Sequence, residues 1–235
     1  MLQDITSGFV PKMRTATDTS SPLSWISRMA AVLSIMFSTL ASSPAYAQNP
    51  MDESGAASVA YLACVLEGRP VTVDAAVRSL VERCGYDPGM PTDQFVSQTL
   101  ATLPSEPLAP VAEQLAPFRR QFTDKQFAYV VSLDHVLQTS KSFDEMSIQL
   151  ARLEAQATNE LGRSEQDLKV LGALSSARHG FSFLSTFEDG RVSTMGFWRD
   201  LLQVGKVIGG FAAGFVLGGP ILACICAWGV MALMN

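Results

Sequence analysis

The feature that most constrains this chain is an uncharged stretch at its C-terminal end. Val207 to Met234 contains no Asp, Glu, Lys or Arg. As one helix it would measure about 42 Å, which exceeds the roughly 30 Å that a bilayer hydrocarbon core requires. A helix that is apolar on every side is stable only in lipid or inside a protein core. The stretch therefore predicts a membrane segment, and the rest of the chain must fold around or beside it.

Three glycines in this stretch share one helical face. Gly210, Gly214 and Gly218 recur at steps of four residues, the spacing of a glycine zipper. Because glycine has no side chain, two backbones can approach closely at such a face and gain dispersion contacts. We therefore predict self-association in the membrane, with a second copy of the chain as partner. The alternative is an apolar anchor in which glycine is merely tolerated.

A proline interrupts the stretch. Pro220 follows Gly218-Gly219, lacks an amide donor and disfavours helix at the residue before it. A single kinked span is the favoured prediction; a tight helical hairpin and a buried glycine-rich pair are the alternatives. Trp198 and Trp228 are predicted to lie at the membrane interface, although a tryptophan near the end of a buried helix needs no such role.

The start of the chain reads as a secretory signal. The apolar run Met29 to Leu40 follows Arg28 and precedes Ala45-Tyr46-Ala47, a small-residue pattern typical of signal-peptidase cleavage. Twelve residues are too few to span a bilayer as a helix. We predict that residues 1–47 are a signal peptide cleaved after Ala47.

Export has consequences for charge. Translation could begin at Met1 or at Met13, and either start keeps the same apolar run and cleavage site. Removal of the signal peptide changes the net charge of the chain from −5 to about −6. An acidic chain has no electrostatic footprint for nucleic acid and is repelled by anionic lipid. The expected location is periplasmic or extracellular and membrane-associated, with membrane lipid bound through the tail.

The four cysteines fall into two pairs. Cys64 and Cys84 flank a Gly-Arg-Pro turn, and in an oxidising compartment a disulfide would close a loop of about 20 residues and stabilise the fold by about 3 kcal/mol. Two small buried thiols are the alternative. Cys224 and Cys226 lie in the apolar tail, where thiols behave as small hydrophobes.

The middle of the chain predicts three capped helices. Thr123 with Gln126 and Ser142 with Glu145 fit the capping box, and Ser164 with Asp167 is a weaker copy. The second helix carries an apolar stripe at steps of three and four: Phe143, Met146, Leu150, Leu153, Ala157 and Leu161. Short connections make consecutive helices antiparallel. We predict a three-helix stack from 123 to about 187.

No strand pattern of similar strength occurs, so the predicted class is all-α. Three shorter helices are expected at Gly55 to Leu66, from Thr72 or Asp74 to Cys84, and from Asp93 to about Leu103. Prolines at 104, 107, 110 and 117 then form either a linker or a wrap across one larger domain. The expected organisation is a small helical region with a proline-rich linker at 48–117, the stack at 118–190, an amphipathic juxtamembrane segment at 191–206 and the membrane segment at 207–234.

Gly209 to Gly219 resembles the tails of bacterial glycine-zipper proteins, including bacteriocin-like exported proteins with Gly-xxx-Gly repeats. The run Leu171 to His179 resembles them loosely. The resemblance implies a bacterial exported protein.

Residues for catalysis are scarce. His135 and His179 lie on two predicted helices without further converging ligands, and His179 is expected to be exposed or to cap a helix end. There is no Gly-x-Ser-x-Gly elbow and no phosphate-binding glycine loop. We therefore expect no enzyme, no metal and no cofactor.

Two functions remain as hypotheses. The first is an exported helical protein tethered by a tail that self-associates. Export would leave Lys206 outside and only Asn235 on the cytoplasmic side, so the usual positive inner flank is missing. This oddity motivates the second hypothesis, a secreted membrane-active effector whose tail inserts into another bilayer.

Overall fold

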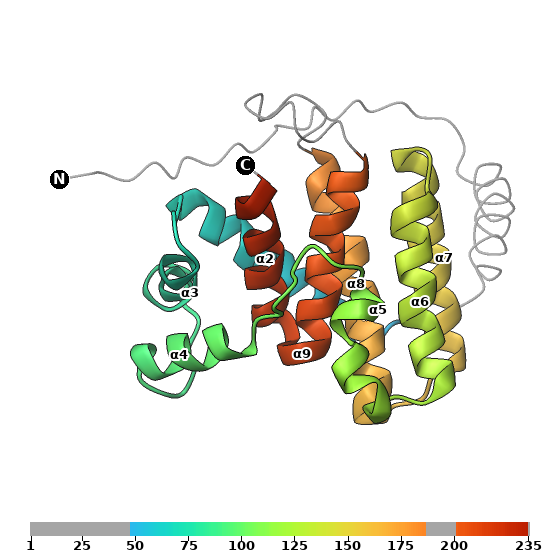
Figure 1. Cartoon of the computed structure of the whole chain (residues 1–235), viewed down its shortest axis with the longest axis horizontal. Helices are drawn as coiled ribbons and strands as arrows, with labels where there is room; N and C mark the ends of the chain where they lie inside the picture. Colours follow the sequence, from blue (N-terminus) through green and yellow to red (C-terminus); the bar gives the residue numbers. More distant parts are fainter. Residues whose placement is uncertain (1–47, 187–200, 235) are drawn as a thin grey trace, which may run out of the picture. The chain divides into compact units, whose positions relative to one another are not determined.

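The computed structural model describes residues 48–186 and 201–234, and every regular element in these ranges is a helix (Figure 1). The chain divides into two units, Met1–Ala45 and Tyr46–Asn235, and the described residues belong to the second. The all-α prediction is confirmed. The predicted signal peptide and residues 187–200, including Trp198, lie outside the described residues.

The three-helix stack is present. It consists of α6 (Asp124–Thr139), α7 (Phe143–Glu160) and α8 (Glu165–Thr186), each of which contacts the other two. The predicted side chains start these helices. Thr123 Oγ1 accepts the Gln126 amide at 3.2 Å while the Gln126 side chain accepts the Thr123 amide at 2.8 Å. Ser142 accepts the Glu145 amide at 3.1 Å. These bonds satisfy amides that a helix start leaves unpaired.

The apolar stripe of α7 faces the core as expected. Met146, Leu150, Leu153 and Ala157 are buried, whereas Ile148, between them in sequence, is exposed. This separation follows from the helical period of 3.6 residues. The stack thus has one polar face and one face that the rest of the unit must cover.

The N-terminal helices are α2 (Asp52–Gly68), α3 (Val73–Glu82) and α4 (Thr92–Thr102). α2 begins earlier than predicted, with two acidic residues in its first turn, where negative charge is favourable. It ends at Arg69, which has a left-handed φ of 48°. Thr72, one of the two cap residues that the sequence left open, caps α3 through the Ala75 amide.

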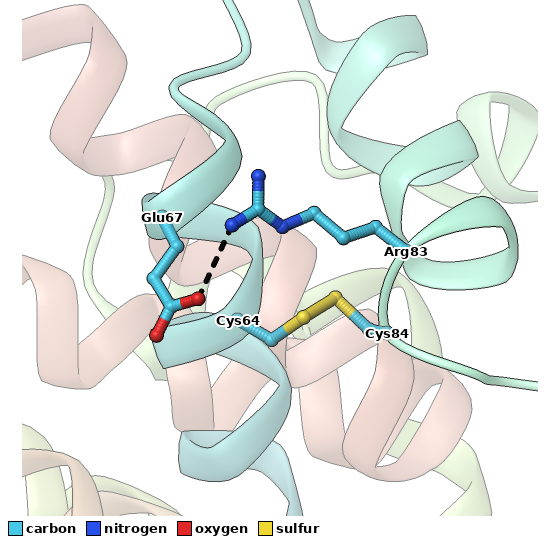
Figure 2. The surroundings of a disulfide bond; sticks show 4 residues. All are labelled: Cys64, Glu67, Arg83 and Cys84. Carbon is cyan, nitrogen blue, oxygen red and sulfur yellow. Dashed lines mark hydrogen bonds and ion pairs between the residues drawn. A yellow bond between two sulfur atoms is a disulfide. The ribbon is translucent and has the colours of Figure 1, made fainter. Parts of the chain in front are cut away.

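A disulfide joins Cys64 on α2 to Cys84 just beyond α3, with 5.9 Å between their Cα atoms (Figure 2). This is the first of the two alternatives left by the sequence. The Arg83 guanidinium donates to the Glu67 carboxylate at 3.2 Å beside it. The disulfide links α2 covalently to the end of α3.

The proline-containing segment is a wrap, not a linker. It forms α5 (Val111–Gln114) and the 3₁₀ helix η2 (Ala116–Gln121). The Asp134 carboxylate on α6 accepts the backbone amides of Val111 and Ala112, both at 2.7 Å. Burial raises the pKa of Asp134 above its ordinary value, although these two hydrogen bonds oppose the shift. The described residues of regions 48–117 and 118–190 share one hydrophobic core.

Candidate functional site: the C-terminal helical hairpin

The uncharged stretch folds back on itself. α9 (Leu201–Met234) contains two non-helical residues, Gly218 and Gly219, and Gly219 has a φ of 72°. Residues 201–217 form a first arm and residues 220–234 a second arm, which Figure 1 shows as an orange-red and a dark red helix. The prediction of a single kinked span is therefore wrong for the folded protein. The chain reverses its direction because Gly219, directly before Pro220, has a positive φ. The hairpin alternative is the structure.

The glycine face of the first arm packs against the second arm. A Cβ atom added at Gly214 would lie 2.5 Å from the carbonyl oxygen of Leu222 and 2.7 Å from the Cα atom of Ala223. One added at Gly210 would lie 3.2 Å from the carbonyl group of Cys226. The approach at Gly214 leaves no room for a side chain, and the one at Gly210 is tighter than an ordinary Cβ contact.

Gly218 completes the face at the turn, where an added Cβ would lie 3.1 Å from the Leu222 side chain. The face from which we predicted self-association is thus occupied by the same chain. Contact between copies through this face stays a prediction, and it requires the two arms to separate.

The first arm also fits α8. An added Cβ at Gly180 would lie 2.6 Å from the Phe211 ring, and one at Gly172 would overlap the Phe215 ring. Phe211 is fully buried and Phe215 is 3% exposed. Glycines on α8 therefore form the hollows into which the two aromatic side chains of the hairpin insert.

A further close approach joins the first arm to α6. An added Cβ at Gly205 would lie 2.8 Å from the carbonyl oxygen of Leu137. Gly209 faces Leu137 and Val111 at ordinary contact distance. The proline-containing segment, which Asp134 holds in place, thus covers the same side of the hairpin.

The second arm is covered as well. Trp228 is 5% exposed, Cys224 fully buried and Cys226 3% exposed. α2, α3 and α4 all contact α9. We predicted that Trp228 lies at a membrane interface. In this structure it lies inside the protein, which is the alternative that the sequence left open.

Length and composition still fit a membrane. Counted across its turn as one element of 34 residues, α9 is the one helix among the described residues that is long and apolar enough to cross a bilayer; neither arm alone reaches 18 residues. Most of it is nevertheless buried within the protein. The hairpin is thus an uncharged, apolar segment that the helices of its own unit enclose.

A polar cluster missed by the sequence reasoning joins three helices. Arg178 on α8 donates to the carboxylates of Asp52 on α2 and Glu154 on α7. The Glu154 side chain is 8% exposed. The Nε2 atom of His179 lies 2.9 Å from Oδ1 of Asp52. The available signal was the helical spacing of Arg178 between the apolar residues Leu174 and Phe181, since a guanidinium that is partly removed from water requires carboxylate partners.

The cluster corrects the expectation for His179, which lies inside α8 rather than at a helix end. Partial burial opposes ionisation of Asp52, but its hydrogen bond to His179 and the charge of Arg178 outweigh that effect. The pKa of Asp52 is therefore below its ordinary value. Because desolvation offsets much of the attraction between paired charges, this cluster is weak evidence for stability.

No group of three His, Cys, Asp or Glu side chains that would hold a metal ion occurs within residues 48–186 and 201–234. The expectation of a protein without catalytic activity stays a prediction. The chain matches no protein-family model, no curated protein and no solved structure. Function has to be argued from the hairpin and its surroundings.

Proposed function

We propose that this is an exported, non-enzymatic, membrane-active protein that stores its C-terminal hairpin inside a helical unit and inserts it into a lipid bilayer. The observation that carries the proposal is the enclosure of an uncharged stretch, Val207 to Met234, by α2, α6 and α8. Of the two hypotheses from the sequence, this one corresponds to the secreted effector.

Both environments suit the same segment. An all-round apolar helix is stable in a protein core and in lipid, so transfer exchanges one set of apolar contacts for another. The backbone hydrogen bonds of each arm are internal to its helix and move with it. The cost of release is therefore concentrated in the close contacts of Gly172, Gly180, Gly205 and the aromatic rings.

The dimensions fit insertion of a hairpin that enters the bilayer without both arms crossing it. Arms of 17 and 15 residues would measure about 25 and 22 Å, so the first reaches the lower limit of a spanning helix and the second falls short of it. The turn at Gly218, Gly219 and Pro220 carries no charge. Lys206, near the start of the first arm, can extend its ammonium to the interface. Insertion led by the turn therefore moves no charged side chain through the hydrocarbon.

Self-association is a second proposal that follows from the first. The spacing of Gly210, Gly214 and Gly218 supports it, because lipid offers no better partner for a glycine face than another helix. In the stored form the second arm occupies this face. Oligomers are therefore expected only after the hairpin has left the unit and its arms have separated.

Dye release from vesicles tests insertion. The processed protein, added at micromolar concentration to dye-loaded vesicles of uncharged phosphatidylcholine, should release the dye. Gly229→Asp is the informative variant: Gly229 is half-buried and nothing lies within 4 Å of a Cβ at this position, so a side chain can begin there without a clash. In the bilayer the same charge costs up to about 3 kcal/mol, and release should fall at least about tenfold.

Ile148→Asp is the matched control, because this side chain is 52% exposed on α7 and lies outside the hairpin. It should release dye like the unaltered protein. Absence of release by the unaltered protein would contradict the proposal. Equal release by Gly229→Asp would show that another segment enters the membrane.

A further inference from the structure

The first described residues of the chain are held by the polar cluster. The Asn49 side-chain amide donates to the Glu154 carboxylate at 2.6 Å and to the carbonyl oxygen of Leu171 at 3.0 Å. Its oxygen accepts the Met51 amide at 2.9 Å. Asn49 is 8% exposed. The backbone one residue after Gln48 is thus fixed between α7 and α8.

Negative charge is in excess at this place. An open surface hollow of about 230 Å³ adjoins Asn49, and Gln48, an exposed residue, lies at its edge. The charged groups that line the hollow are the carboxylates of Asp52 and Glu154 and the single guanidinium of Arg178. His179 borders the cluster through Asp52. A second cation here would gain more than one in open solvent, because Glu154 is largely removed from water.

We infer that this cluster is the docking site of the α-ammonium group of Gln48, which is formed when the chain is cleaved after Ala47. Cleavage adds water across the Ala47–Gln48 peptide bond: Ala47 leaves as a carboxylate, and the Gln48 nitrogen, a neutral amide before, becomes an amine that takes up a proton. The new cation lies one residue from Asn49, whose side chain already contacts Glu154. Processing thereby places a positive charge where α2, α7 and α8 meet.

The inference rests on the predicted cleavage site and not on the membrane activity. A chain that inserts into vesicles without docking its terminus would leave the proposed function intact. A chain that docks its terminus but never contacts lipid would leave this inference intact.

The chemistry of glutamine supplies a direct readout. A terminal glutamine cyclises when its neutral amine attacks its own side-chain carboxamide; a C–N bond forms, ammonia leaves and the mass falls by about 17 Da. An ammonium has no lone pair for this attack. Pairing with a carboxylate keeps the nitrogen protonated, so a docked Gln48 should cyclise slowly and react slowly with acylating reagents.

The experiment uses the full chain exported and processed in bacterial cells. N-terminal sequencing should give Gln48, and mass spectrometry follows both acetylation of the α-amine at pH 7 and cyclisation over days. In Glu154→Gln both rates should rise about tenfold, since one pKa unit changes the fraction of free amine tenfold. Glu53→Gln is the matched control: it removes the same charge from an exposed residue in the first turn of α2.

A second variant and a second measurement guard against loss of folding. Asp52→Asn should act in the same direction if Glu154→Gln does not fold. Carbamoylation of the α-amine alone should lower the Tm by about 3 °C, the shift expected for about 1 kcal/mol in a chain of this size. Equal rates in the unaltered protein and in both variants would overturn the inference. So would a mature chain that begins at another residue or is isolated already cyclised.

Discussion

The three-helix stack and the C-terminal hairpin solve the problem of burial in different ways. α7 begins at a side-chain cap and divides its residues between a buried stripe and an exposed face, with Met146 and Ile148 on opposite sides. α9 has no polar face to present. The neighbours of α9 approach it most closely at glycines. The second arm approaches at Gly210 and Gly214, and α6 approaches at Gly205.

The difference explains which region can change its surroundings. The stack depends on water at one face, so it is stable only at a protein surface. The hairpin needs no water at either arm and is specified by shape alone. A segment of this kind can leave its protein partners for lipid whenever the lost close packing is compensated by new contacts.

The largest expected effect comes from closing the gap between the arms. Gly214→Ala puts a Cβ atom 2.5 Å from a backbone oxygen, which no rotamer change relieves. We expect a loss of about 3 kcal/mol in the free energy of unfolding, the upper end of the usual cost of overpacking, measured by urea denaturation. Gly229→Ala makes the same chemical change where nothing lies within 4 Å, and it should stabilise by about 0.5–1 kcal/mol. Similar values for the two variants would mean that the arms do not pack.

Removing the disulfide tests whether α2 and α3 keep the hairpin enclosed, because both helices contact α9. Replacing Cys64 and Cys84 by alanine should lower the free energy of unfolding by about 3 kcal/mol, the value for a loop of this length. The same variant should release dye at lower protein concentration. Glu67→Gln, which removes the exposed ion pair beside the bond, should change neither quantity (Figure 2). Unaltered dye release by the alanine variant would show that this cover does not control the hairpin.

The smallest effect is expected at a cap in the stack. Ser142→Ala should cost about 1 kcal/mol, since the Glu145 amide loses its acceptor. Ser147→Ala, at an exposed position inside the same helix, should be neutral or slightly stabilising. If Ser142→Ala were neutral too, the hydrogen bond of this cap would not stabilise α7.

The sequence predicts the stack well because its signals are local. Thr123 and Ser142 lie three residues from the amides they accept, and the stripe of α7 repeats within one helix. The Cys64–Cys84 pairing was one of two alternatives, since sequence spacing does not measure a distance between sulfur atoms.

The hairpin and the cluster could not be predicted in the same way. A uniformly apolar segment has no polar face to show what covers it, and the left-handed conformation of Gly219 cannot be told from helical glycine in a sequence. Arg178 finds partners at positions 52 and 154, far apart along the chain. Asp134 accepts backbone amides, which leave no trace in the identity of Val111 or Ala112.

Lipid contact of the second arm is the central claim, and Trp228 reports it directly. In the processed chain, Trp198→Phe leaves Trp228 as the one tryptophan. Vesicles whose acyl chains carry bromine quench tryptophan on contact. We predict that its emission falls by at least about half relative to unbrominated vesicles, and that Gly229→Asp abolishes the difference. Equal emission in both kinds of vesicle, with the protein shown to be bound by cosedimentation, would contradict insertion of the hairpin.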